Sequence, residues 1–377
     1  MKTVHRVLQN EIEKRLQPGK VMLLFGARRV GKTVLIKEIS SAFDGSTLFL
    51  NGDDSHAVSI LNERSISNYQ HLLKGIDLLI IDEAQNIPDI GEKLKLIVDH
   101  VDRIKIIASG SSSFDLQNKA GQPLVGRSST FHLFPFSQEE LRPEENVLET
   151  KQNFELRLLY GSYPELSHIN TLNEKREYLN EVTTAYLLKD ILNFNGIRNA
   201  AKMRDLLKMI SYQVGSEVSV EELGSNLSIS KNTVNAYLDL LTKVFIIYPL
   251  NGFSRNLRKE INKKNKWFFY DNGIRNALIN DFSPLSIRQD TGALWENYLI
   301  SERRKKMYFH LLPKNHYFWR TYDQQEIDLI EEENNILSAF EFKWSAGKSK
   351  IPGAFAKAYP NASYTVINRD NYLNFIL

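Results

Sequence analysis

The segment from Val21 to Ser40, VMLLFGARRVGKTVLIKEIS, contains glycines, a lysine and a threonine at a spacing that can bind a chain of phosphates. Gly26, Gly31, Lys32 and Thr33 fit the pattern G-x-x-x-x-G-K-[ST], with an apolar run before it and a helix-like pattern after it. Glycines allow the backbone amides to turn toward phosphate oxygens, and the first turn of a helix adds a positive field. The pattern therefore predicts a loop that binds ATP, with Lys32 at the β and γ phosphates and the Thr33 hydroxyl on Mg²⁺.

The same loop also carries two arginines, Arg28 and Arg29. Each of them either contacts the nucleotide or only braces the loop. We expect the bound nucleotide to lie against Gly26, Arg29, Gly31, Lys32, Thr33 and Val34.

A second apolar run, IDLLIIDEAQ, ends in a pair of acids. After a phosphate-binding loop, a pair in this order predicts that Asp82 holds the Mg²⁺ shell and that Glu83 polarises the water that attacks ATP. A third run, RIKIIASGSSS, leads into Ser109 at a strand end, where α/β sheets bind their ligands. Ser109 either senses the γ-phosphate or is an ordinary turn residue.

These three runs must be strands that end at one edge of a sheet. Two more strands are indicated by STLFLNGDD and STFHLF, and helical patterns lie between the strands. This alternation predicts an α/β fold in residues 1–135, with a parallel sheet and helices on both faces, as in P-loop NTPases.

The segments FGARRVGKT, LLIIDEAQ, IIASGSSSFDL and LVGRSSTFHLFPFSQEEL resemble a group of bacterial and archaeal AAA-type P-loop ATPases. The later segments YGSYPEL, YLLKDIL and FFYDNGIRNAL resemble the C-terminal region of unknown function that accompanies these ATPases. The resemblance covers nearly the whole chain. It implies an arginine that reaches the γ-phosphate of a neighbouring subunit, and Arg127 is the candidate by position. If Arg127 has that role, the protein is a homo-oligomer. The alternative is that Arg127 binds a carboxylate in its own chain.

The middle of the chain has a different periodicity. Residues 136–200 are mostly helical in pattern, and we expect a lid or connector there. In residues 201–280, two short helices meet at a turn, and Lys231, Asn232, Thr233 and Asn235 lie on the outer face of the second. Six basic residues and one acid between Asn251 and Tyr270 occupy the position of a wing. This winged-helix pattern favours contact with DNA, although such a domain can also be a protein-binding module.

Residues 281–377 contain charged residues in the order of the PD-(D/E)XK nuclease fold, which this region resembles. Glu296 lies in a helix, Asp328 is expected to end a strand, and Glu341 and Lys343 share one face of the next strand. We expect a small α/β domain of the restriction-endonuclease type. Its carboxylates either hold Mg²⁺ for cutting phosphodiester bonds or are relics of such a site.

Composition limits the alternatives. The 377 residues are enough for two or three domains, and the absence of cysteine excludes disulfides and thiolate metal sites. The net charge of +3 is too small to indicate a nucleic-acid partner by itself. We expect a cytoplasmic protein with no membrane segment, because the N-terminal pattern is not that of a signal peptide and no apolar run is long enough to cross a bilayer.

The sequence thus predicts an ATPase of the AAA type that acts as a molecular switch or motor and engages DNA. The alternative is a nucleotide-controlled signalling or assembly protein whose C-terminal domains bind protein and are catalytically inactive.

Overall fold

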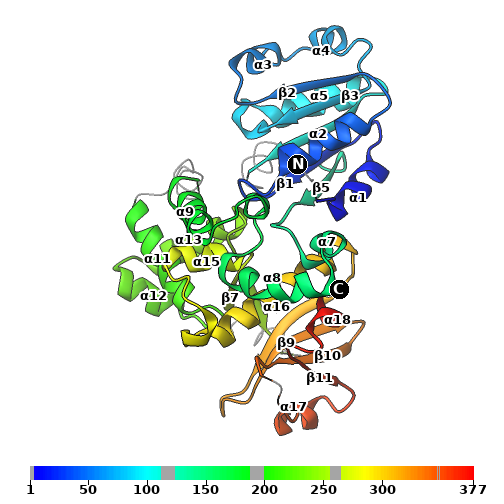
Figure 1. Ribbon diagram of the computed structural model, residues 1–377. Coiled ribbons are helices and arrows are strands. Elements are labelled where there is room, and N and C mark those ends of the chain that lie inside the picture. Colours follow the sequence, from blue (N-terminus) through cyan, green and yellow to red (C-terminus); the bar gives the residue numbers. More distant parts are fainter. Residues whose placement is uncertain (1–3, 112–123, 187–198, 255–264, 346, 348) are drawn as a thin grey trace. The chain divides into compact units, whose positions relative to one another are not determined.

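The computed structural model describes residues 4–111, 124–186, 199–254, 265–345, 347 and 349–377 (Figure 1). The described chain divides into two compact units. The first contains Met1–Phe134 and Lys243–Phe245, and the second contains Pro135–Thr242 and Ile246–Leu377.

The first unit alternates helices and strands along the chain. Its elements are α1 (Val7–Arg15), β1 (Val21–Phe25), α2 (Lys32–Ala42), β2 (Thr47–Asn51), α3 (Ser55–Ile60), α4 (Ile66–Leu72), β3 (Leu78–Asp82), α5 (Ile90–His100), β4 (Lys105–Gly110) and β5 (Ser128–His132).

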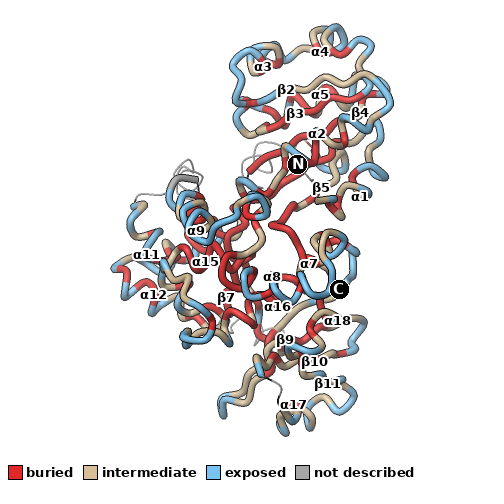
Figure 2. Tube along the Cα trace, in the orientation of Figure 1, coloured by how far each residue is buried: buried red, intermediate tan, exposed pale blue. Residues whose placement is uncertain are grey.

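Among the described residues, the strands of this unit form one sheet with the order β2-β3-β4-β1-β5, and every neighbouring pair is parallel. Every residue of β1 and β3 is buried, as the tube in Figure 2 shows, and helices α1, α2 and α5 flank the sheet. Strands buried on both faces are continuously apolar, which explains the runs VMLLF and LLIID. The predicted parallel α/β fold is confirmed.

The second unit begins with helices and ends with a sheet. Its elements are α7 (Gln138–Leu141), α8 (Val147–Tyr160), α9 (Leu172–Glu181), α11 (Ala200–Tyr212), α12 (Val220–Leu227), α13 (Lys231–Lys243), β6 (Ile247–Gly252), β7 (Lys266–Phe269), α15 (Asn272–Leu278), α16 (Thr291–Phe309), β8 (Asn315–Arg320), β9 (Glu326–Glu333), β10 (Ile336–Phe342), α17 (Gly353–Ala358), β11 (Ser363–Ile367) and α18 (Tyr372–Ile376).

In the described part of this unit, the sheet has six strands in the order β11-β10-β9-β8-β6-β7. Strands β8, β9 and β10 are antiparallel neighbours, whereas β11 is parallel to β10 and β6 is parallel to β8. The hairpin of β6 and β7, which follows the predicted helix-turn-helix, therefore belongs to the same sheet as the strands of the predicted nuclease-like region. A core that includes Phe253, Trp319, Ile327 and Phe355 covers one part of this sheet.

The helix-turn-helix pattern corresponds to α12 and α13. The Ser230 hydroxyl accepts a hydrogen bond from the Thr233 amide at 3.1 Å and so caps α13. The inner face of the helix pair is apolar and buried, and it comprises Leu223, Leu227, Val234, Leu238 and Leu241. On the outer face, Lys231, Asn232 and Asn235 are exposed and Thr233 is half-buried.

Asp328 does not end its strand, in contrast to the prediction. It is the third residue of β9, which continues to Glu333 because Leu329 and Ile330 are buried and the strand stays paired with β8 and β10. Since β9 and β10 are antiparallel, the start of β9 lies beside the end of β10. The Phe342 amide accordingly donates a hydrogen bond to the Asp328 carboxylate at 2.7 Å.

Of the residues that the structure describes, none belong to a helix with both the length and the hydropathy needed to cross a membrane.

Candidate functional site

The predicted phosphate loop connects β1 to α2 at the carboxyl edge of the sheet. Gly31, the residue before α2, has φ of 94°, which favours glycine, and Arg29 adopts φ of 65°. A Cβ added to Gly26 would lie 2.3 Å from the carbonyl oxygen of Leu133, so no larger residue fits there. The backbone of this loop is therefore held in a turn that only these glycines permit.

Lys32 is directed back into the loop. Its Nζ donates hydrogen bonds to the carbonyl oxygens of Gly26 at 2.9 Å and Ala27 at 3.0 Å, and the residue is only 5% exposed. A buried ammonium group needs such partners, and phosphate oxygens would be stronger ones because they are charged. Lys32 thus lies where the prediction requires a cation.

Thr33 and Asp82 meet across the sheet edge although they are 49 residues apart. The Thr33 hydroxyl donates to Asp82 Oδ2 at 2.7 Å. Ser109 is fully buried and donates from its hydroxyl to Asp82 Oδ1, while the Glu83 amide donates to Ser109 Oγ at 3.3 Å. The structure therefore places Ser109 as a partner of Asp82; sensing of the γ-phosphate stays a prediction.

The oxygen donors at this edge fit Mg²⁺ in the way that a nucleotide site requires. Mg²⁺ prefers oxygen ligands and takes several of them from phosphates and water, so the chain supplies only one or two. A hydroxyl and a carboxylate 2.7 Å apart beside Lys32 meet that need. Within the described residues, no group of three or more His, Cys, Asp or Glu side chains could hold a metal ion without such help.

Two features of the site were missed at the sequence level. Gln85 donates from Nε2 to Glu83 Oε2 at 2.6 Å, and so fixes the side chain expected to polarise water. Gly52 packs on the same turn, because a Cβ there would lie 2.3 Å from the Glu83 carbonyl oxygen. Glu83 itself has φ of 49°, a left-handed value that costs energy for a non-glycine residue. Gln85 could have been predicted as a site residue because it follows the acid pair in the DEAQ segment. The sequence around Gly52 contains nothing that predicts its packing against Glu83.

Three further residues were predicted to contact nucleotide: Arg29, Val34 and Arg127. Arg29 and Val34 are exposed, and Val34 is the first exposed apolar residue of α2. Arg127 precedes β5 and accepts a hydrogen bond at its carbonyl from the Val21 amide, at the amino end of β1. It therefore lies at the opposite edge of the sheet from its own phosphate loop. Its Nε forms an ion pair with Asp99 Oδ1 at 2.6 Å.

The predicted nuclease-like residues come together in the second unit. Glu296 on α16, Asp328 on β9 and Glu341 on β10 interact electrostatically, and Lys343 Nζ lies 2.6 Å from Glu341 Oε1. Lys343 lies one residue beyond the end of β10. Burial raises the pKa of Glu296, and burial with the negative charges of Glu296 and Glu341 raises the pKa of Asp328 well above its usual value.

A fifth charged residue, Lys266, lies in this cluster and corrects the wing prediction. We expected Lys266 to contribute to an exposed basic wing, but it is 2% exposed and its Nζ lies 3.2 Å from Glu296 Oε1. It also forms an ion pair with Glu326. Burial alone would lower the pKa of Lys266, but the neighbouring carboxylates outweigh burial and raise it. The other basic residues of the predicted wing, at 255–264, lie outside the described residues.

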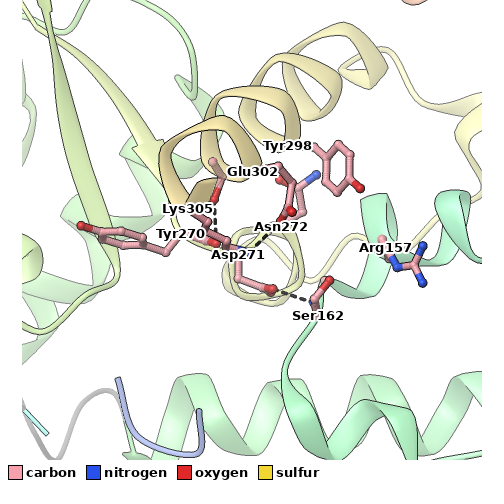
Figure 3. A pocket seen from close by; sticks show the side chains of 10 residues that line it. Arg157, Ser162, Tyr270, Asp271, Asn272, Tyr298, Glu302 and Lys305 are labelled. Carbon is pink, nitrogen blue, oxygen red and sulfur yellow. Dashed lines mark hydrogen bonds and ion pairs between the residues drawn. The ribbon is translucent and has the colours of Figure 1, made fainter. Parts of the chain in front are cut away.

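A separate polar cluster lines a cavity of about 10 Å³ in the second unit, which is the size of a single water site (Figure 3). Asp271 accepts hydrogen bonds from the amides of Ser162, at 2.7 Å, and Gly273, at 2.8 Å. Gly161 has φ of 74°, and a Cβ there would lie 1.9 Å from Asp271 Oδ1. The YGS and YDNG segments thus pack against each other, and the cluster joins the end of α8 to the start of α15.

Three family models match separate parts of the chain. The model of an AAA domain matches residues 18–142, and two models of domains of unknown function match residues 151–285 (DUF8612) and 291–375 (DUF4143). The first match includes all strands of the parallel sheet and the nucleotide-site residues described above. It supports an AAA-type P-loop ATPase, and such a domain implies that a nucleotide is used.

Similar chains occur in bacteria and archaea. An uncharacterized protein of Mycobacterium tuberculosis is 26% identical over 337 residues, which are 88% of this chain and 72% of that protein. One from Methanocaldococcus jannaschii is 25% identical over an alignment of 387 positions, which covers 96% of this chain and 84% of that protein. A solved structure from Pyrococcus horikoshii, a Signal Transduction ATPase with Numerous Domains with a tetratricopeptide repeat sensor, gives a TM-score of 0.33 and 14% identity. That match covers 82% of this chain and 48% of the other, so this chain spans about half of that protein.

Removal of single side chains at the sheet edge should separate ATP binding from turnover. We expect Lys32→Ala to abolish ATP binding, because each charge-assisted hydrogen bond to phosphate contributes about 1.5–3 kcal/mol. We expect Glu83→Gln to bind ATP normally but to release phosphate at least about 100-fold more slowly. Equilibrium binding of ATP and the rate of phosphate release measure the two effects, and near-normal turnover by either variant would contradict the assignment.

The two possible roles of Arg127 predict different turnover for the variants Arg127→Ala and Asp99→Ala. If Arg127 acts on the nucleotide of a neighbouring subunit, Arg127→Ala should lower turnover by about 100-fold or more without weakening ATP binding, and Asp99→Ala should retain turnover. If Arg127 only pairs with Asp99, the two variants should have the same turnover. Phosphate release measured over a range of protein concentrations distinguishes these outcomes.

Proposed function

We propose that the protein is a Mg²⁺-dependent ATPase of the AAA type that works as a nucleotide-controlled switch. The observation that carries the proposal is the Thr33 hydroxyl held 2.7 Å from the Asp82 carboxylate, directly beside the buried Lys32. These three groups are the hydroxyl, carboxylate and cation that a triphosphate with its metal ion needs. The AAA-domain match over the same residues supports it.

Each residue has a part in this proposal that follows from its position. Lys32 exchanges its carbonyl partners for phosphate oxygens when ATP binds, and Thr33 and Asp82 orient the Mg²⁺ shell. Glu83, fixed by Gln85, orients the attacking water. Bound Mg²⁺ would neutralise the charge that develops on the phosphates.

Assembly into a homo-oligomer is the second part of the proposal. Arg127 lies at the sheet edge opposite its own phosphate loop, so it can act only on a nucleotide held by another chain. Its Nε is paired with Asp99, and the Arg127 side chain is 41% exposed. We propose that this exposed guanidinium exchanges Asp99 for a neighbouring γ-phosphate on assembly.

DNA is the partner that we propose for the second unit. The capped helix pair α12 and α13 supports this, because its second helix exposes Asn232 and Asn235, residue types that read base edges. A protein partner is the second candidate. It is favoured by Lys231, whose Nζ is paired with Glu221 at 2.5 Å, and by the burial of Lys266, since both reduce the positive charge open to phosphates.

The rate of phosphate release with and without duplex DNA separates the two candidates. If DNA is the partner, we expect duplex DNA to stimulate turnover and the double variant Asn232→Ala/Asn235→Ala to lose most of the stimulation. Added salt should weaken the effect, because phosphate contacts release counterions.

The matched control is Asn173→Ala, which removes an exposed asparagine from α9, outside the helix pair. It should leave the stimulation unchanged. Turnover that ignores DNA at low salt would contradict the DNA proposal and favour the protein partner, while the ATPase assignment would stand on the turnover itself.

A further inference from the structure

The resemblance of the C-terminal region to a nuclease implies a divalent metal ion held by Glu296, Asp328 and Glu341. The positions of the charged side chains around these carboxylates show whether such an ion fits. Carboxylates that hold Mg²⁺ must place oxygen atoms about 2.0–2.1 Å from the ion. Lys266 Nζ lies 3.2 Å from Glu296 Oε1 and is ion-paired with Glu326. A cation of the chain itself therefore already lies among these carboxylates.

Lys266 is fixed from several sides. Its backbone pairs with Leu250 on β6 and forms an isolated bridge with Glu217 on the other side. Its ammonium group lies 5.4 Å from the centroid of the Phe318 ring, a cation–π distance, and the residue is 2% exposed. Movement of the ammonium group out of the cluster would require a change in β7 or in its neighbours.

The charges of the cluster are close to balanced without a metal. The carboxylates of Glu296, Glu326, Asp328 and Glu341 face the cations of Lys266, Lys343 and Arg320, whose Nε lies 3.6 Å from Glu326 Oε2. A divalent ion added to this set would be repelled by the neighbouring ammonium group at short range. Among the described residues, moreover, no three acidic or histidine side chains are grouped so that they could hold a metal ion.

We infer that Lys266 is a built-in cation that takes the place of a divalent metal in the nuclease-like cluster, so that this site binds no Mg²⁺ and cuts no phosphodiester bond. The carboxylates then act as an anchor. They join β7, at one edge of the six-stranded sheet, to α16 and to β9 of the same sheet.

Titration of the full chain with Mn²⁺ in the absence of nucleotide tests the inference. Electron paramagnetic resonance measures the concentration of free Mn²⁺, and the bound amount follows by difference. Wild type and Asp328→Asn should bind the same amount of Mn²⁺. Lys266→Met should bind one further ion per chain, because a positive charge beside the carboxylates is gone. The double variant Lys266→Met/Asp328→Asn should lose that ion.

The matched control is Lys305→Met, which removes another buried lysine that is paired with a carboxylate, Glu302, at 2.7 Å. It should gain no ion. Any weak binding at the phosphate loop is common to all variants and cancels in the comparison, so the test does not depend on the ATPase proposal.

Two results would overturn the inference. One is a Mn²⁺ ion bound by wild type and lost in Asp328→Asn, which would show a working metal site. The other is a Lys266→Met protein with a native circular dichroism spectrum and no additional ion. If Lys266→Met does not fold, the comparison of wild type with Asp328→Asn still decides, because it needs no change at Lys266.

Discussion

The position of β4 between β1 and β3 is the constraint on which the nucleotide site depends. The carboxyl ends of parallel strands meet at one edge, so this order places the phosphate loop after β1 and the acids after β3 on either side of the end of β4. Ser109, at that end, is in reach of Asp82, and Asp82 is in reach of Thr33. A strand order with β1 and β3 at the two edges of the sheet would separate these groups, whatever the motifs.

Much of this edge could be predicted because its signals are local. Gly31, with its left-handed backbone, and the buried run before Asp82 each follow from a few neighbouring residues and their backbone requirements, and the same holds for the Ser230 cap in the second unit. The contacts that could not be predicted join residues far apart. Gly161 must be small because of Asp271, and Lys266 is buried because carboxylates from α16 and β9 surround its side chain. No short window of sequence contains both partners of such a pair.

The second unit shows how charge can be misinterpreted in a linear sequence. A lysine in a basic segment is usually solvated, and the same lysine becomes structural when the sheet surrounds it with carboxylates. The error about the end of β9 has a similar origin, since Leu329 and Ile330 extend the strand beyond Asp328. The burial of Lys266 among carboxylates supports our inference that this cluster joins α16 to the sheet and holds no metal ion.

The central claim is that the Thr33 hydroxyl and Asp82 carboxylate form the metal side of an ATP site, and the metal dependence of ATP affinity tests it most directly. The affinity is measured with and without Mg²⁺ for wild type and for Thr33→Val, which replaces only the hydroxyl by a methyl group. The account predicts that Mg²⁺ tightens ATP binding by wild type and has a much smaller effect on Thr33→Val. Equal metal dependence in the two proteins, or no ATP binding by wild type, would contradict it.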